Sequence, residues 1–248
     1  MKFSELIEEF EKIYPKDLCE SWDNAGLMLG NPEKDIKKAV VVLDVTQRAV
    51  DFAKENGCDL IFTHHPFIMS GIKSINFSLK KGEFIQQLIK NDICVYSAHT
   101  NFDTAENGVN DALCELLSAD VTDNSAMVRK AQLKSPVTLS VFIEKVKEIL
   151  NAPYVTVAGD LDREILKIGV CGGGGGCFIG DCADCDVLLT GEAKYHEYQQ
   201  ACEIGLAVVA AGHFETENVT LYKIRQLLSD MKITVLDGDI HKSFCKIV

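Results

Sequence analysis

An internal repeat is the feature of this sequence that most restricts its fold. The segment Cys58–Thr63 (CDLIFT) aligns with Cys185–Thr190 (CDVLLT). Each is followed by a predicted helix and then by a short apolar strand that ends near a histidine, His99 in the first half and His213 in the second. This repeated order of strand, helix and strand favours a real duplication over two α/β units that merely look alike.

Apolar periodicity predicts the other elements. Apolar runs predict further strands at 38–44, 93–98, 154–158, 165–170, 206–211, 232–236 and near 243–247. Helical spacing predicts helices at 3–14, 46–56, 82–90, 107–118, 138–150, from about 196 to about 205, and from about 213 to 229. Ser4 and Thr46 are the expected N-caps of the first two helices. The polar stretches 21–27 and 119–136 are predicted to be a turn and a connection.

We therefore expect an α/β fold made of two duplicated, intertwined halves with mixed sheets. The predicted halves are residues 1–125 and 126–248, and the C-terminal segment from about 213 could pack back on the first half. In such folds ligands collect at the carboxyl ends of the strands, so the strand ends are where functional residues are expected.

Composition limits the class of protein. The net charge of −12 argues against broad binding of nucleic acid or of an anionic membrane. No apolar run approaches the roughly 18 residues that span a bilayer. The first residues carry glutamates where a signal peptide would be apolar. We therefore expect a cytoplasmic protein whose ten cysteines are reduced.

Most of the histidines lie at the ends of predicted strands. Five of the six do so, namely His64, His65, His99, His196 and His213, whereas His241 is expected to be a surface or structural residue. A carboxylate follows two of them at a spacing of four residues, Asp103 after His99 and Glu217 after His213. Imidazole and carboxylate together suit Zn²⁺, Mn²⁺ or Fe²⁺. The pattern predicts a metal site.

The adjacent pair His64 and His65 favours two ions over one. On an extended backbone, neighbouring side chains point to opposite faces, so the two imidazoles cannot both bind the same ion easily. One ion apiece, with a carboxylate between them, fits this constraint. Two such ions would share and activate a water molecule.

Four motifs make a resemblance to a known family specific. They are THHP at Thr63–Pro66, HTNFD at His99–Asp103, TGEAKYH at Thr190–His196 and GHFETE at Gly212–Glu217, and DNAGL at Asp23–Leu27 looks like the family's N-terminal motif. In this order they resemble the GTP cyclohydrolase I type 2-like family, also called the Nif-three-like (NGG-one-interacting factor three) family. The match covers nearly the whole chain and is similar to the short form, which lacks an inserted domain.

The resemblance implies a dinuclear metal site between the halves. Its implied ligands are His64, His65, Asp103, His213 and Glu217. By the family pattern Glu217 bridges two divalent transition-metal ions per chain, whose identity as zinc, iron or manganese stays open. The resemblance also implies a ring-shaped homohexamer with the sites facing an inner cavity. No residue is assigned to an organic cofactor.

Two histidines lie outside that ligand set. His99 and His196 are candidates for the general acid or base, and each could equally orient a metal ligand.

A glycine run flanked by cysteines admits several interpretations. Gly172–Gly176 follows a strand, so its N–H groups could cradle a phosphate, or the run could be a tight turn between packed layers. Cys171, Cys177, Cys182 and Cys185 could hold zinc or an iron–sulfur cluster, but their spacing is not that of two Cys-x-x-Cys pairs, which favours structural cysteines.

Two functions follow. The first is a metal-dependent hydrolase of a nucleotide-like small molecule, of the GTP cyclohydrolase type by family resemblance. The alternative is a non-catalytic metal-binding or regulatory assembly module. A nucleic-acid-binding ring is disfavoured by the acidic balance, and no membrane partner is expected.

Overall fold

The computed structural model describes residues 1–236 and 242–245. The chain divides into two compact units, one formed by Met1–Ala105 with Leu221–Val248 and the other by Glu106–Thr220. The predicted boundary between residues 125 and 126 lies within the second unit, and the chain from Leu221, part of the segment that could pack back on the first half, belongs to the first unit. His241 and part of the strand predicted near 243–247 lie outside the described residues.

The first unit is built on a five-stranded mixed sheet in the order β1-β4-β3-β2-β11. Its strands are β1 (Gly26–Leu29), β2 (Lys38–Val42), β3 (Leu60–Thr63), β4 (Cys94–Ser97) and β11 (Thr234–Leu236). Strands β4, β3, β2 and β11 are parallel, and β1 runs antiparallel to β4. Every residue of β3 and β4 is buried, which explains why these strands read as continuous apolar runs.

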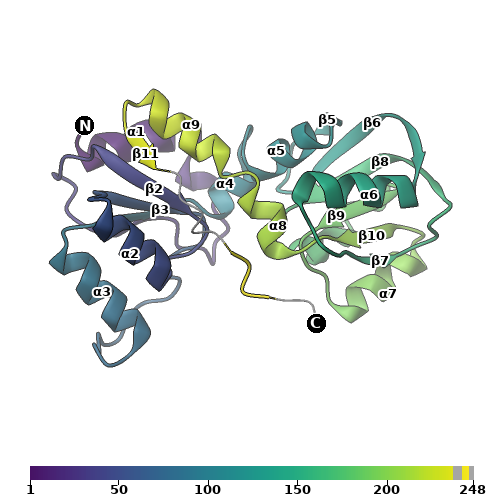
Figure 1. Ribbon diagram of the computed structural model, residues 1–248. Coiled ribbons are helices and arrows are strands. Elements are labelled where there is room, and N and C mark those ends of the chain that lie inside the picture. The colour runs from purple at the N-terminus through teal and green to yellow at the C-terminus, as the bar shows by residue number, and fades with distance from the viewer. Residues whose placement is uncertain (237–241, 246–248) are drawn as a thin grey trace. The chain divides into compact units, whose positions relative to one another are not determined.

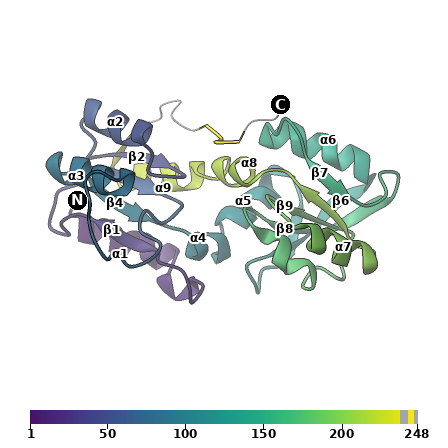
Figure 2. The same cartoon turned by 90° about the horizontal axis from the view of Figure 1, so that it is seen from below.

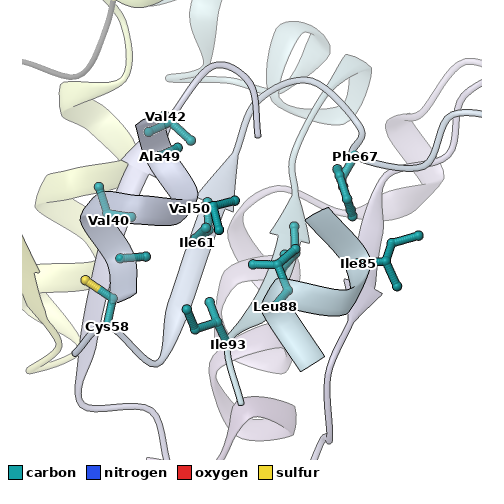
Figure 3. Close-up of a cluster of buried hydrophobic side chains, with 12 residues drawn as sticks. Val40, Val42, Ala49, Val50, Cys58, Ile61, Phe67, Ile85, Leu88 and Ile93 are labelled. Carbon is teal, nitrogen blue, oxygen red and sulfur yellow. The ribbon is translucent and has the colours of Figure 1, made fainter. Parts of the chain in front are cut away.

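Helices cover both faces of this sheet. They are α1 (Phe3–Ile13), η1 (Lys16–Leu18), α2 (Gln47–Glu55), α3 (Lys80–Lys90), α4 (Thr100–Thr104) and α9 (Tyr222–Asp230). Figure 1 shows α2 and α3 on one side of β2 and β3, with α1 and α9 on the other. Successive residues of β3 pack against helices on opposite faces of the sheet. Ile61 belongs to the apolar cluster with α2 and α3 (Figure 3), whereas the ring of Phe62 lies on the other face, with its centroid 4.9 Å from that of Phe10 in α1.

The second unit is built on a six-stranded mixed sheet in the order β5-β6-β8-β9-β10-β7. Its strands are β5 (Asp120–Asp123), β6 (Arg129–Thr138), β7 (Thr156–Ala158), β8 (Glu164–Cys171), β9 (Val187–Thr190) and β10 (Ala207–Ala210). Strands β8, β9 and β10 are parallel to one another. Its helices are α5 (Val109–Leu116), α6 (Leu139–Leu150), η2 (Gly175–Ile179), α7 (Tyr195–Glu203) and α8 (His213–Asn218). Figure 2 shows α6 and α7 on opposite sides of the sheet.

The predicted duplication is confirmed at the level of strand order. The run β1-β4-β3-β2 in the first sheet matches β7-β10-β9-β8 in the second, including the antiparallel outer strand. The aspartates of the repeated sequence accept equivalent backbone hydrogen bonds in the two units. Asp59 Oδ2 accepts hydrogen bonds from the backbone N–H groups of Lys37 and Lys38 at 2.9 and 3.0 Å. Asp186 Oδ2 accepts two equivalent bonds at 2.9 Å from residues 166 and 167.

Several local predictions are wrong. The stretch 119–136 is not a connection but contains β5 and most of β6. The predicted turn 21–27 ends early, because β1 begins at Gly26. The first helix is capped by Lys2 rather than Ser4, and Glu5 accepts the Lys2 backbone N–H at 2.8 Å. The single helix predicted after His213 is two helices, α8 and α9, which belong to different units.

Among the described residues, no helix has the length and apolar character that a bilayer crossing requires.

Candidate metal centre

Three histidines gather at the carboxyl end of the first sheet. His64 and His65 follow β3 directly, and His99 lies two residues beyond the neighbouring strand β4. Their ring centroids are 5.2 Å apart for His64 and His65, 5.3 Å for His64 and His99, and 5.8 Å for His65 and His99. Each offers one ring nitrogen within 4.8 Å of the other two, so the group could hold a metal ion. The parallel pairing of β3 with β4 brings these strand ends together.

Each of the three imidazoles is held through Nδ1 by an oxygen acceptor. The Nδ1–H groups donate from His64 to the Ala98 carbonyl at 2.8 Å, from His65 to Asp44 Oδ1 at 2.9 Å, and from His99 to Asp23 Oδ1 at 2.8 Å. A proton on Nδ1 leaves the lone pair on Nε2, which is the form of imidazole that binds a metal. Hydrogen bonds of this kind orient the histidine ligands of protein metal sites and raise their basicity. The donor set therefore fits a transition-metal ion.

Asp23 is the most strongly held of these acceptors. Its side chain is fully buried, and Oδ2 accepts hydrogen bonds from the Thr100 backbone N–H at 3.0 Å and from the Thr100 hydroxyl. Burial by itself would raise the pKa of Asp23, but the hydrogen bonds from His99 and Thr100 outweigh it and lower the pKa to about 2. Asp23 is therefore a carboxylate at neutral pH, as an acceptor for the His99 N–H must be.

Asp103 lies on α4, beside His64. Its Oδ1 is 3.5 Å from Nε2 of His64, and its side chain is 14% exposed. The short helix α4 begins immediately after His99, so one turn of helix brings Asp103 back toward the strand ends. The first unit thus brings together all three of its predicted ligands, His64, His65 and Asp103, and adds His99 to them.

The second unit carries the other predicted donors on α8. His213 and Glu217 are one helical turn apart, with His213 Nε2 3.1 Å from Glu217 Oε1. The Glu217 side chain is buried, whereas that of His213 is 36% exposed. Glu192, which follows β9, approaches the other ring nitrogen, with its Oε2 3.5 Å from His213 Nδ1. An imidazole and a carboxylate therefore face the same side of α8.

The glycine run packs against these two side chains. A Cβ on Gly173, whose φ is +60°, would lie 2.1 Å from Glu217 Oε1 and 3.3 Å from His213 Nε2. The N–H groups of the run already have acceptors within the unit, because those of Gly172, Gly173 and Gly175 donate to Asn110 Oδ1, Thr216 Oγ1 and Thr190 Oγ1 at 2.8, 3.0 and 2.9 Å. Because three N–H groups of the run already donate to side chains, the structure favours the tight turn over the phosphate cradle.

The remaining candidates lie apart from these donor groups. His196 is exposed near the start of α7 and belongs to no group of metal donors among the described residues. Within the same part of the chain, the four cysteines around the glycine run form no such group either. Cys171, Cys182 and Cys185 are buried in one apolar cluster with Leu188, which is where structural cysteines belong.

Sequence reasoning missed the two aspartates that orient histidines. Asp44 follows β2, the strand next to β3, so its position at a strand end was a usable signal. Asp23 belongs to the predicted polar turn 21–27 and to the DNAGL motif, but neither assigns it a role beside a histidine. Its partner His99 is 76 residues away, and no local pattern reports such a pair.

Comparison with known proteins gives a consistent result. The family model Duf34/NIF3 (NGG1p interacting factor 3) matches residues 1–243. A protein of Clostridium perfringens named GTP cyclohydrolase 1 type 2 homolog is 36% identical over 97% of this chain and 94% of its own length. Protein NIF3 homolog of Schizosaccharomyces pombe is 31% identical over 96% of this chain and 90% of its own.

Solved structures agree with the fold. The structure of reduced HcgD from Methanocaldococcus jannaschii superposes with a TM-score of 0.81 at 34% identity, covering 95% of this chain and 96% of that one. A Bacillus cereus protein related to NIF3 superposes with a TM-score of 0.89 at 24% identity, covering 100% of this chain and 99% of that one. The mixed α/β fold with two mixed sheets is therefore that of NIF3 structures. With a family model spanning nearly the whole sequence and relatives above 30% identity, this chain belongs to the Duf34/NIF3 (NGG1p interacting factor 3) family.

Proposed function

We propose that this protein is a metal-dependent hydrolase of a nucleotide-like small molecule, of the GTP cyclohydrolase type. The observation that carries the proposal is the common orientation of His64, His65 and His99, whose Nδ1 atoms all donate to oxygen acceptors. Three imidazoles prepared in the same tautomer are costly to arrange for structure alone, and this arrangement is the usual support of a metal site.

The proposed centre holds two divalent transition-metal ions per chain, zinc, iron or manganese. The residues that would hold them are His64, His65, Asp103, His213 and Glu217. Support comes from the donors that each unit carries by itself and from the resemblance to the family. Bound ions would supply Lewis acidity and would lower the pKa of a water molecule to give a nucleophile near neutral pH.

Around this centre, His99 is the residue best suited to hold or move a proton. Its Nδ1–H is committed to Asp23, so protonation changes occur at Nε2. Asp23 would stabilise the imidazolium when Nε2 takes up a proton. His196 stays a second candidate for the acid or base. Its side chain is exposed and therefore accessible to solvent protons.

The nucleotide-like substrate is supported by the names of the relatives, which are GTP cyclohydrolase 1 type 2 homologs in several bacteria. The test is incubation of metal-loaded protein with GTP, followed by assay of formate and of the ring-opened product. His65→Ala serves as the control. Formate released no faster by the wild type than by His65→Ala would refute the cyclohydrolase activity.

Elemental analysis tests the centre apart from turnover. About two transition-metal ions per chain are expected in the wild type, and fewer in His64→Ala and in Glu217→Ala. Size-exclusion chromatography with light scattering tests the proposed homohexamer of 27.3-kDa chains.

The second candidate function is a non-catalytic metal-binding or regulatory assembly module. The family's description as an interacting factor favours it. X-ray absorption on the metal-loaded protein separates the two functions. A coordination shell filled by protein ligands alone would favour the assembly module, and an exchangeable water would favour the hydrolase.

A further inference from the structure

The only tryptophan of the chain lies on the surface beside His99, one of the three histidines. Trp22 is 60% exposed, and its ring centroid is 5.9 Å from that of His99, with the two rings at 75° to each other. Tryptophan is highly buried on average in folded proteins. Core packing therefore does not account for a tryptophan in this position.

The turn that carries Trp22 is fixed at both ends by a single residue. The turn closes through the hydrogen bond from Asp23 N to Glu20 O at 2.9 Å, with Trp22 at its third position. The Glu20 N–H donates to Thr100 Oγ1 at 2.9 Å, and the Thr100 N–H donates to Asp23 Oδ2 at 3.0 Å. Thr100, the first residue of α4, thus holds the Glu20 backbone on one side of Trp22 and the Asp23 side chain on the other, so little ordering is needed before a ligand contacts the indole.

We propose that Trp22 is a stacking surface for the planar heteroaromatic ring of the ligand that binds at the metal centre. An indole offers a large, rigid π-face that accepts any base, and its contact with His99 places the indole next to the metal donors of the same unit. The inference rests on the proposed function only for the class of ligand, a nucleobase or a similar ring. It adds the residue that selects the ring.

A single tryptophan makes the test direct, because all indole fluorescence comes from Trp22. Metal-loaded protein is titrated with GTP and, separately, with inorganic tripolyphosphate, with excitation at the red edge of the indole band. Saturable quenching by GTP, and none by tripolyphosphate, is the expected result. Equal quenching by both probes, or no binding of GTP, overturns the inference.

Two variants separate stacking from simple apolar contact. Trp22→Phe keeps an aromatic face, and Trp22→Leu keeps apolar bulk without one. Position 22 is exposed, so both variants should fold, which circular dichroism checks. By equilibrium dialysis with labelled GTP, Trp22→Leu should bind about tenfold more weakly than the wild type, and Trp22→Phe within about threefold of it. Equal affinities for Trp22→Leu and the wild type overturn the inference.

Formate assays on the same samples distinguish this inference from the proposed function. Weakened binding in Trp22→Leu without formate release by any sample refutes the hydrolase and supports the stacking role. Normal turnover and affinity in Trp22→Leu refute the stacking role and leave the hydrolase intact. A change in assembly mass in Trp22→Leu with GTP affinity unchanged would assign Trp22 to a contact between copies of the chain, and this too overturns the inference.

Discussion

Gly173 lies so close to Glu217 that a methyl group on its Cα would come within 2.1 Å of Oε1. Its φ of +60° is also one that residues with a Cβ adopt only with strain. The glycine thus sets the space in which the carboxylate of Glu217, a proposed metal ligand, lies. Most of this constraint is invisible in the sequence, where Gly173 is one of five consecutive glycines.

Gly173→Ala should therefore disturb the Glu217 side chain and lower metal binding. The strained φ alone should cost about 1–2 kcal/mol of unfolding free energy. Elemental analysis measures the metal content per chain, and urea unfolding measures the change in the free energy of unfolding. Gly174→Ala is the matched control, since no atom lies within 4 Å of a Cβ at that position. Equal metal content in the two variants would contradict the role assigned to Gly173.

Replacing Asp23 by asparagine tests the carboxylate behind His99. The amide keeps the size of the side chain but removes the charge that fixes the His99 tautomer, so formate release by the metal-loaded protein should fall about 10–100-fold. The formate assay with GTP measures this rate, and elemental analysis checks that the metal content is unchanged. Asp17→Asn, an exposed change in the same unit, should leave the rate unaltered. A rate unaltered in both variants would show that Asp23 plays no part in positioning His99.

The strand ends were predictable because the buried parallel strands leave a strong local pattern. Cys58–Thr63 and Cys185–Thr190 are short, mostly apolar runs, and they contain the fully buried strands β3 and β9, which pair with β2 and β8. A histidine directly after such a strand lies at the carboxyl end of the sheet, and this placement does not depend on the other elements of the fold. This is why His64, His65 and His99 could be expected to lie close together before their partners were known.

Strand β6 was not predictable for the opposite reason. The buried face of β6 consists of Arg129, Ala131 and Leu133. Because a charged residue stands at the first of these positions, the sequence lacks the apolar alternation that predicts a strand. Pro136 adds a breaker, which the strand accommodates where its pairing with β8 shifts register between Gln132 and Val137. The buried Arg129 depends on its ion pair with Asp111, and Pro136 depends on the irregular pairing with β8. Neither partner lies in the sequence next to β6.

Native-state alkylation should sort the cysteines by burial. Cys177, Cys202 and Cys245 are exposed and should react with iodoacetamide in the folded protein, whereas Cys114 should react only after unfolding. Burial, reinforced by Asp111, raises the pKa of Cys114 from 9.0 to about 12. Mass spectrometry of the labelled peptides measures this order, and early labelling of Cys114 would contradict its burial.

The same shift predicts a pH dependence of stability. Above about pH 9 the unfolded chain loses the Cys114 proton, while the folded protein keeps it up to about pH 12. The unfolding free energy should therefore decline as the pH rises through this window. Cys114→Ala should remove part of that decline, as measured by urea unfolding across the window. An identical slope in the wild type and the variant would contradict the raised pKa.

Strand β6 offers the sharpest test of how the second unit is stabilised. The guanidinium of buried Arg129 donates to Asp111 Oδ1, and to the carbonyls of Ala126 and Met127. Asp111→Ala would leave this cation buried without its counter-charge, a change that costs about 3–5 kcal/mol. Loss of the pair should therefore lower the urea midpoint strongly.

The control for that change lies on the same strand. Lys134 pairs with Asp120, but both side chains are about two-thirds exposed, at 65% and 67%. Solvent and salt screen such a pair, so Asp120→Ala should cost about 0–1 kcal/mol, and less at high ionic strength. The loss in Asp111→Ala should persist in salt, because water does not reach the Arg129 side chain. Similar losses for the two variants would mean that Arg129 finds enough compensation from the backbone carbonyls alone, and that the ion pair does not hold β6 to α5.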